Sequence, residues 1–416
     1  MRLDEYGAIE VDEFPATRQS LRIAVVTETY PPEVNGVAAT IASFVEGLQR
    51  RNHVVQLIRP RQGKAEAAGT NDRFHEVLLG GLPIPNYPHL KMGLPSKRAL
   101  VRLWKHRRPD LVHVVTEGPL GWSAVQAAST LRLPVCSDFR TNFHSYSKHY
   151  GIGWLHRPIL AYLRKFHNRT RLTMVPTEAL RRQLAGEGFH NLKVVARGVD
   201  TVQFHPQKRS EVLRQRWGAA PDAPVVLHVG RLAPEKNLAA LLAAYDTLMG
   251  AYPALTFVFV GDGPSRSELE RRCPRAIFAG MRTGDDLAAH YASGDVFLFP
   301  STTETFGNVT TEAMASGLAV VAYDYAAAAQ LIESRVSGML APVDQTSEFI
   351  ATAVELVGQP GTAARMGRRA RTVAEQHSWE RVVEELETMF LQVLHSDLPP
   401  PAVPPAPSSF SRVIDT

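Results

Sequence analysis

Apolar and polar positions alternate along the chain in a pattern that predicts repeated β-α-β units. The first unit has a short apolar strand that ends in a proline turn, "LRIAVVTETYPP", then a segment with helical spacing, "GVAATIASFVEGLQRRN", then a second strand, "HVVQLIRP". Similar units follow in "RALVRLWKHRRPDLVHVVT", "GPLGWSAVQAASTLRLPVCSDF" and "LTMVPTEALRRQLAGEGFHNLKVVARGVD". The strands are short and rich in valine, which is typical of parallel strands buried on both faces. This order of elements predicts a doubly wound sheet.

The pattern stops and restarts in the middle of the chain. A polar stretch with prolines, "FHPQKRSEVLRQRWGAAPDAP", predicts a linker with one helix. Six strand candidates with helices between them follow: "PVVLHVGRL", "LTFVFVGDGP", "AIFAGM", "DVFLFP", "LAVVAYD" and "GMLAPVD". We therefore predict an α/β fold with two Rossmann-like doubly wound parallel-sheet domains that face each other across a cleft. In such sheets ligands bind at the carboxyl ends of the strands.

The end of the chain has a different character. An amphipathic helix is predicted in "HSWERVVEELETMFLQVL", and the proline-rich segment after it is expected to be disordered. We expect the helix to pack back on the first domain. The predicted organisation is an N-terminal extension over 1–20, a first Rossmann-like domain over 21–204, a second over 205–378, the C-terminal helix over 379–395, and a tail over 396–416.

Composition favours a soluble protein of a reducing compartment. Of the 416 residues, 44% are hydrophobic and 21% are charged, as in ordinary globular domains. Apolar runs stay shorter than the roughly 18 to 20 residues of a membrane-spanning helix, and the acidic N-terminus is unlike a secretory signal. Two cysteines, Cys136 and Cys273, are too few for a disulfide framework or a cysteine zinc site. A cytoplasmic location is the expectation.

The charge is divided unevenly. Residues 1–200 hold 28 Lys and Arg against 17 Asp and Glu, whereas the rest hold 18 against 24. In 91–108 and 154–171, basic residues alternate with leucine and aromatic residues, which suits an anionic membrane surface such as the inner leaflet. The alternative is an ordinary helix with a solvated basic face. Nucleic acid is not expected as a partner, since no recognition motif accompanies the charge.

Three predicted strands end in residues that could bind a ligand. The first of these strand ends is "HVGRLAPEKN". A strand ends at Gly230, and Arg231 and Lys236 follow it just before a helix. Glycine lets the backbone approach a ligand, while two cations and a helix N-terminus suit a diphosphate. A lone pair of cations with this spacing is more often a solvated turn.

The other two strand ends are "VGDGP", a tight turn that begins at Gly261, and "PSTTETFGNVTTEAMASG". In the latter, Glu304 follows a strand and Glu312 lies in the first turns of the next helix. A carboxylate there can accept hydrogen bonds from the vicinal hydroxyls of a sugar. The alternative for Glu312 is a capping role at the helix N-terminus. Because a D-x-D motif at a strand end is lacking, we expect neither a metal nor another cofactor.

These motifs resemble those of a known family. "GRLAPEKN", "VGDGP" and "PSTTETFGNVTTEAMASGLAVVA" are similar to the donor-site signatures of family 4 glycosyltransferases, which are retaining enzymes of GT-B fold that use nucleotide sugars. The resemblance continues through "TETYPPEVNGVAATI" and "SDFRTNFHSYSKHYGIG" and covers about 21–395. It is greatest to the branch with sulfoquinovosyl-diacylglycerol synthases and GDP-mannose-dependent mannosyltransferases. It implies that the first domain takes the acceptor and the second takes the donor.

The resemblance also implies roles for single residues. Glu304 would face the donor sugar, Glu312 would bind the ribose, and Arg231 and Lys236 would neutralise the diphosphate. Further contacts are implied for Phe306, Gly307 and Asn308 with the sugar hydroxyls, for Val309 and Thr310 near the phosphates and ribose, for Phe278 and Gly280 near the base, and for Gly36 near the diphosphate and acceptor.

One position departs from the family pattern. Arg140 in "SDFRTNFHSY" stands where related sequences have a histidine near the donor sugar and acceptor. Arginine stays protonated, so it cannot act as a base, but it suits a phosphate or an anionic sugar. If the segment is helical, His144 fills the gap, because positions i and i+4 share a face; the alternative is that His144 only packs.

The function implied by the resemblance is retaining transfer of a hexose, without a metal, from a nucleotide-diphosphate sugar such as GDP-mannose or a UDP-hexose to a hydroxyl acceptor. The expected acceptor is a membrane lipid or glycolipid, with a glycan as the other candidate. Two alternatives remain open: a non-catalytic protein that binds nucleotide sugars, and a nucleotide-sugar epimerase of GT-B fold.

Overall fold

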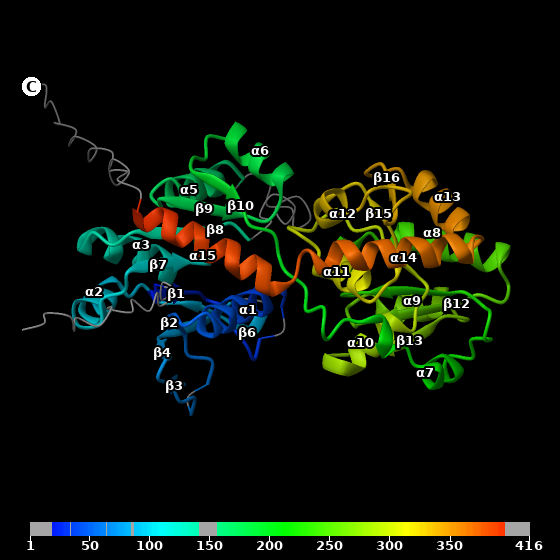
Figure 1. Cartoon of the computed structure of the whole chain (residues 1–416), viewed down its shortest axis with the longest axis horizontal. Coiled ribbons are helices and arrows are strands. Elements are labelled where there is room, and N and C mark those ends of the chain that lie inside the picture. The colour runs from blue at the N-terminus through cyan, green and yellow to red at the C-terminus, as the bar shows by residue number, and fades with distance from the viewer. Residues whose placement is uncertain (1–18, 34, 64, 85–86, 141–155, 396–416) are drawn as a thin grey trace, which may run out of the picture.

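The computed structural model describes residues 19–33, 35–63, 65–84, 87–140 and 156–395. It contains two α/β domains that lie side by side along the long axis of the molecule, each built on one sheet (Figure 1). The two Rossmann-like parallel-sheet domains predicted from the strand pattern are therefore confirmed. The tail over 396–416, nearly all of the extension over 1–20, and His144 lie outside the described residues.

The N-terminal sheet has eight strands in the order β10-β9-β8-β7-β1-β2-β4-β3. Neighbours pair in parallel except β3 and β4, and Val25 of the central strand faces Leu57 on one side and His113 on the other. The strands are β1 (Arg22–Val26), β2 (Val54–Pro60), β3 (Thr70–Asn71), β4 (Phe74–Leu79), β7 (Leu111–Val114), β8 (Val135–Asp138), β9 (Leu172–Val175) and β10 (Leu192–Val194). The helices are α1 (Gly36–Arg50), α2 (Lys97–His106), α3 (Pro119–Leu131), α5 (His156–His167) and α6 (Glu178–Gly186).

Two parts of this domain were not predicted: the strands β3 and β4, and a separate antiparallel hairpin of β5 (Gly81–Ile84) and β6 (Tyr87–Gly93). All six residues of β4 are half-buried. Its sequence, "FHEVLL", therefore has neither the continuous apolar run of a fully buried strand nor the alternation of a strand with one exposed face. The hairpin sequence contains prolines, which sequence rules assign to turns or strand edges.

The C-terminal sheet has six parallel strands in the order β13-β12-β11-β14-β15-β16. All six correspond to the predicted candidates. They are β11 (Val225–Val229), β12 (Thr256–Val260), β13 (Ile277–Gly280), β14 (Val296–Phe299), β15 (Ala319–Tyr323) and β16 (Met339–Ala341). The helices are α7 (Glu211–Arg216), α8 (Leu238–Ala251), α9 (Arg266–Arg272), α10 (Gly284–Ala292), α11 (Asn308–Ala315), α12 (Ala326–Leu331), α13 (Thr346–Val357) and α14 (Pro360–Glu375).

The last helix, α15 (Trp379–His395), crosses from the C-terminal domain and lies against α1 of the N-terminal domain (Figure 1). Its apolar face, which includes Phe390, joins the hydrophobic core beneath α1. Nε2 of His53 lies 3.0 Å from Oε1 of Glu387, and Nδ1 of the same ring accepts from the amide of Leu21 at 3.0 Å. Nδ1 is therefore unprotonated, and Nε2 carries the proton that is donated to Glu387.

We predict that Phe390→Ala lowers the free energy of unfolding of the N-terminal domain by about 3–5 kcal/mol, because it empties a fully buried aromatic site. Urea unfolding followed by circular dichroism measures the change. Gln392→Ala, on the exposed side of the same helix, is the control and should stay within about 0.5 kcal/mol of wild type. Equal midpoints for the two variants would contradict the packing of α15.

Candidate active site

The crevices of the two sheets open toward each other. The strand order reverses between β1 and β7 in one sheet and between β11 and β14 in the other, and ligands of such folds bind at these switch points. Gly36, the first residue of α1, lies where the two meet. A Cβ built on it would lie 3.4 Å from Nη1 of Arg197 and 3.7 Å from Nδ2 of Asn308, the first residue of α11. The N-termini of α1 and α11 thus face each other across the domain boundary.

An ion pair lies at the switch point of the C-terminal sheet. Lys236 follows β11 and Glu304 follows β14, and the ammonium of Lys236 donates to Oε1 of Glu304. Oγ of Ser301 donates to the same oxygen at 2.8 Å. Thr303 joins the two loops again by donating from Oγ1 to the carbonyl of Glu235 at 2.8 Å. Because the side chains of Lys236 and Glu304 are 20% and 16% exposed, a ligand can reach both.

Arg231, the second predicted cation, lies in the same loop but is more open. Its side chain is 50% exposed, and Nη1 lies 3.5 Å from Oε1 of Glu235. A half-exposed ion pair of this length contributes little to stability. The guanidinium is therefore available to an anion that enters beside Lys236.

Two glycines permit the close approach of these loops. Gly261 has a φ of +133°, and a Cβ there would lie 2.0 Å from the carbonyl oxygen of Gly230. Its amide donates to the carbonyl of Gly280 at 2.9 Å, which links the ends of β12 and β13. Gly307 has a φ of +98° as the N-cap of α11, and its Cβ position is 3.4 Å from Cγ of Glu304. A side chain would be strained at either position.

The residues around the start of α11 contribute mainly backbone to the crevice. The side chains of Phe306 and Thr310 are buried, each 1% exposed, and Val309 packs against the same core as Phe306. Asn308 differs, because its Oδ1 accepts from Nη1 of Arg197 at 3.2 Å. This hydrogen bond joins α11 of the C-terminal domain to the segment that leaves the N-terminal domain.

Glu312 is the fifth residue of α11 and does not cap it, so the capping alternative is wrong. Tyr291 of α10 donates from its hydroxyl to Oε2 of Glu312 at 2.8 Å. Burial raises the pKa of Glu312 to about 7, although the hydrogen bond from Tyr291 lowers it in part. The pKa of Tyr291 is itself raised well above 10, by burial and then by the charge of Glu312.

Phe278, predicted to lie near a base, is half-buried, and its ring packs against the hydrophobic core. The ring stacks on Phe259 with centroids 4.9 Å apart and planes 3° from parallel, on the face covered by α8 and α13. Gly280 ends the same strand with a φ of +75°. A contact from this strand end to a ligand would therefore have to come from the main chain.

Arg140 follows β8 and is tied to a buried carboxylate. Its Nε lies 2.8 Å from Oδ2 of Asp138, which also lies 2.9 Å from Nε2 of His113. The guanidinium is stacked 5.0 Å from the centroid of the Phe44 ring. Burial acts to raise the pKa of Asp138, but Arg140 and His113 outweigh it and lower this pKa to about 2. Asp138 is therefore ionised at neutral pH and pairs with Arg140.

Sequence reasoning missed Arg197 and Tyr291. Arg197 is 5% exposed, and the only signal for it was a charged residue in the apolar stretch "VVARGVD" just after a strand. Burial lowers the pKa of Arg197 to about 9, assisted by repulsion from Arg140 and opposed by Glu304. Tyr291 gave no local signal, since an aromatic residue within a helix is usually part of the core.

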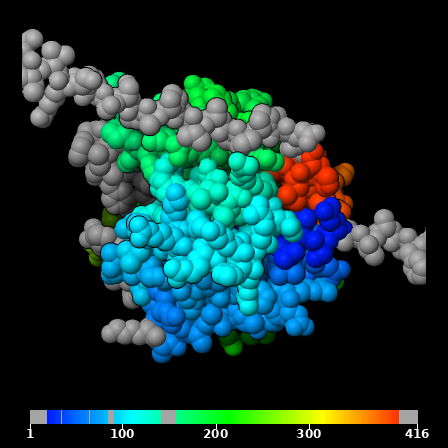
Figure 2. Space-filling view, turned by 90° about the vertical axis from the view of Figure 1, so that its left-hand side faces the viewer, coloured from blue at the N-terminus to red at the C-terminus, as the bar shows by residue number. Residues whose placement is uncertain are grey.

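The basic segment 91–108 does not present its aromatic residue to solvent. Leu100 and Trp104 of α2 are fully buried, and Nε1 of Trp104 donates to Oε1 of Gln56 at 2.9 Å. The exposed side chains of α2 are mostly basic, and the region occupies the centre of the face seen in Figure 2. Three apolar side chains beside it are exposed: Leu82 (53%), Met92 (38%) and Leu94 (39%).

Within the described residues, no helix is long and apolar enough to cross a membrane. Over the same part of the chain, no group of three or more His, Cys, Asp or Glu side chains has the arrangement of a metal site.

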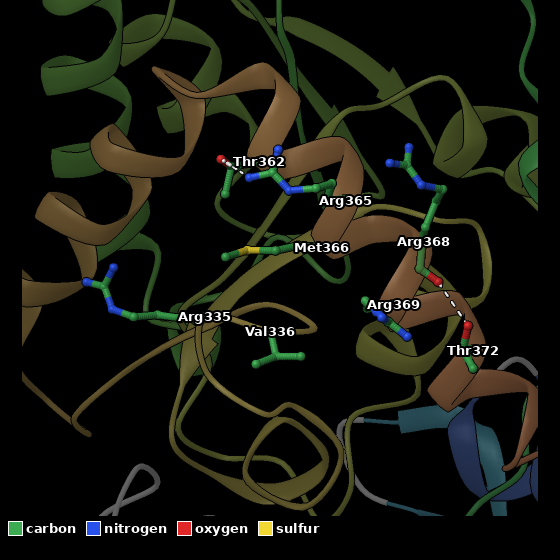
Figure 3. A pocket seen from close by; sticks show the side chains of 8 residues that line it. All are labelled: Arg335, Val336, Thr362, Arg365, Met366, Arg368, Arg369 and Thr372. Carbon is green, nitrogen blue, oxygen red and sulfur yellow. Dashed lines mark hydrogen bonds between the residues drawn. The ribbon is translucent and has the colours of Figure 1, made fainter.

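A cavity of about 540 Å³ lies away from the cleft, between α14 and the loop before β16 (Figure 3). It is lined by Arg335, Val336, Thr362, Arg365, Met366, Arg368, Arg369 and Thr372. Arg335 pairs with both oxygens of Glu355 at 2.7 and 3.1 Å, and Arg365 donates to Oγ1 of Thr362 at 2.9 Å. Of the predicted site residues that the structure describes, none lines this cavity, so it is separate from the candidate active site.

Comparison with known proteins identifies related sequences over both domains. Residues 34–203 match the family model described as Glycosyltransferase Family 4, and residues 223–359 match the model described as Glycosyl transferases group 1. The chain is 36% identical to the GDP-mannose-dependent alpha-mannosyltransferase of Mycobacterium tuberculosis (strain CDC 1551 / Oshkosh) over 372 residues, which cover 88% of this chain and 95% of that one.

A further relative and a solved structure of similar fold were also found. Sulfoquinovosyl transferase SQD2 of Arabidopsis thaliana is 29% identical over 88% of this chain and 72% of its own length. Among solved structures, the sucrose-phosphate synthase of Thermosynechococcus elongatus superposes with a TM-score of 0.73 at 17% identity, covering 90% of this chain and 99% of that one. At this identity the superposition supports the fold alone.

We predict that Glu312→Gln is more stable relative to wild type at pH 8 than at pH 5. A carboxyl whose pKa is about 7 in the folded chain and about 4.5 when unfolded stabilises the fold below pH 4.5, and this contribution is lost as the pH rises through 7. The expected relative gain is about 1–3 kcal/mol, measured by urea unfolding at both pH values. Glu348→Gln, on an exposed position of α13, is the control and should show no such gain.

Proposed function

The chain belongs to the family 4 glycosyltransferases, and we propose that it moves a mannosyl residue from GDP-mannose to a hydroxyl group of a lipid or glycolipid, with retention of the anomeric configuration. The choice of donor rests on the 36% identity to a GDP-mannose-dependent alpha-mannosyltransferase over 88% of this chain. GDP-mannose is itself α-linked, so an α-linked product implies retention. A UDP-hexose is the second candidate for the donor.

In this proposal, Lys236 and Arg231 neutralise the diphosphate leaving group. Cleavage of the bond between sugar and phosphate builds negative charge on the diphosphate and positive charge at the anomeric carbon, so fixed cations beside the phosphate lower the barrier. Lys236 has three donor hydrogens and can contact Glu304 and a phosphate oxygen together. Glu304 then faces the sugar, held in place by Ser301 and Lys236.

We assign Glu312 to the ribose. Tyr291 occupies Oε2 of this carboxylate, which leaves Oε1 to accept from a ribose hydroxyl. The remaining contacts follow the same scheme: main-chain groups of 306–308 to the sugar, 309–310 to the phosphates and ribose, the turns at Gly230 and Gly261 and the strand end at Gly280 to the nucleotide, and Gly36 to the diphosphate.

The proton of the acceptor hydroxyl is assigned to the departing phosphate. Arg140 stays protonated and forms an ion pair with Asp138, so it has no role as a base and instead adds positive charge to the acceptor side. Because Lys236 and Arg231 supply the charge that a divalent ion would, we expect transfer to proceed without a metal.

A measurement of turnover distinguishes this proposal from two alternatives. A non-catalytic binding protein would retain a nucleotide sugar without releasing a nucleoside diphosphate, and an epimerase would change the sugar without an acceptor. The test uses a panel of nucleotide sugars in EDTA. A rise in the unfolding temperature with GDP-mannose, followed by release of GDP when a lipid extract is added, supports the proposal. Stabilisation by UDP-sugars alone would move the assignment to the second donor.

We predict that Glu304→Gln and Lys236→Ala each reduce kcat for sugar transfer by at least about 100-fold, since each removes a group that acts on charge formed in the transition state. Both side chains line an open crevice, so the variants should fold, which circular dichroism checks. Glu268→Gln on an exposed position of α9 is the control. Near-normal turnover by either site variant would overturn the assignment of the ion pair.

We further propose that the surface around α2 docks on an anionic membrane, with Leu82, Met92 and Leu94 at the lipid. The triple variant Lys97→Glu, Arg102→Glu and Lys105→Glu should bind vesicles of phosphatidylcholine and phosphatidylglycerol at least roughly 100-fold more weakly in flotation at low salt.

The matched control for this docking surface is Arg365→Glu, Arg368→Glu and Arg369→Glu on α14, which changes the net charge equally on the other domain. This variant should float like wild type. Equal loss in both triple variants would mean that binding follows net charge rather than the α2 surface, and it would exclude docking through α2.

A further inference from the structure

Arg197 lies on the first of the two chain segments that connect the domains. The amide of Val199 in this segment donates to the carbonyl of His377 at 3.0 Å, and Val199 forms a parallel bridge with Ser378 in the returning segment. A Cβ on Gly198 would lie 2.7 Å from ring atoms of Trp379. The main chain next to Arg197 is thus fixed between the two connections.

The side chain of Arg197 is buried but incompletely bonded. Nη1 donates to Asn308, whereas the buried Nε has no hydrogen-bond partner among the described residues. Arg59 is a useful contrast, because it is equally buried and pairs with Glu66 at 2.6 Å and Glu76 at 2.7 Å. Buried guanidinium groups are normally satisfied in this second way.

The charges around Arg197 leave it without a counter-ion. Within the described part of the chain, no carboxylate lies within 4 Å of it, and Arg140 is close enough to repel it. The two acids that attract it, Glu304 and Asp138, are bonded to Lys236 and Arg140 respectively. An uncompensated buried cation is costly, and such groups are concentrated where a ligand supplies the missing charge.

The helices around Arg197 favour the same kind of ligand. The N-termini of α1 and α11 lie on either side of it, and neither helix has an acidic residue in its first turn. Helix N-termini attract anions, and an arginine fork matches the geometry of phosphate oxygens. Arg197 therefore lies where an oxyanion would complete both its hydrogen bonds and its charge.

We propose that Arg197 binds a phosphate oxygen of the donor diphosphate and so links the donor to the segment that connects the domains. This rests on the proposed function, because it takes the nucleotide sugar as the source of the anion. A phosphate on the acceptor has the same chemistry and is the other source to be tested.

The test measures binding of inorganic pyrophosphate, GDP and guanosine by calorimetry to wild type, Arg197→Gln and Arg197→Lys. We expect Arg197→Gln to bind pyrophosphate and GDP about 10- to 100-fold more weakly, with guanosine unaffected. Arg197→Lys should be intermediate, since it keeps the charge but loses the fork. Arg182→Gln, which removes one charge from an exposed position on α6, is the matched control and should bind like wild type.

A second measurement separates ligand binding from a structural role. If Arg197 only supports the fold, Arg197→Gln should lower the unfolding temperature in ligand-free buffer. If Arg197 instead binds an anion that is absent from the buffer, Arg197→Gln removes an uncompensated buried charge. The unfolding temperature without ligand should then stay equal or rise. The stabilisation by GDP should fall in the same variant. A lower ligand-free temperature with unchanged GDP stabilisation would overturn the proposal.

The remaining outcomes are distinguishable. If wild type binds none of the three ligands GDP, pyrophosphate and UDP, both the proposed function and the role of Arg197 are overturned. Equal binding of pyrophosphate and GDP by wild type and Arg197→Gln would overturn the role of Arg197 alone. If Arg197→Gln binds pyrophosphate and GDP like wild type but has a higher KM for the acceptor, Arg197 binds a phosphate of the acceptor. The assignment of Arg197 to the donor diphosphate is then wrong.

Discussion

The return of α15 to the N-terminal domain is the constraint on which the geometry of the cleft depends. A chain of two Rossmann-like domains joined once could open freely, because interfaces between domains are usually small. Here the chain crosses twice, the crossings pair through Val199 and Ser378, and α15 is packed on α1 and bonded by Glu387 to His53. The two helix N-termini that face each other at Gly36 and Asn308 are held at that separation by these contacts.

Given this arrangement, the chemistry of the cleft follows from charge. Parallel strands place their carboxyl ends at one edge of each sheet, so Lys236, Arg231 and Glu304 come from separate loops to one switch point. The N-terminal domain adds two buried arginines: Arg140, which pairs with Asp138, and Arg197, which donates to Asn308 but has no paired carboxylate among the described residues. Lys236, Arg231 and Arg140 each have a paired carboxylate, so Arg197 is the cation of this group that lacks one among the described residues.

Much of this could be predicted from the sequence, because the signals were local. Buried parallel strands read as apolar runs, and the cations and carboxylates that follow β11 and β14 stand next to those runs. What was missed depends on tertiary contacts. Tyr291 reaches Glu312 from another helix, and Arg197 matters because of Asn308 in the other domain. The half-buried β4 lacks the periodicity that sequence rules need, and the ring of Phe278 faces the core because of the pleat of its strand.

The departure at Arg140 has a consistent physical account in this setting. An arginine at this position, where the sequence resemblance implies a histidine, removes a group that can exchange protons at neutral pH. It is held in place by the carboxylate of Asp138, whose pKa is lowered to about 2, and by the ring of Phe44. It also repels Arg197, which adds to the effect of burial in lowering the pKa of that guanidinium. At this position the cleft therefore has a fixed positive charge in place of a group that could exchange protons.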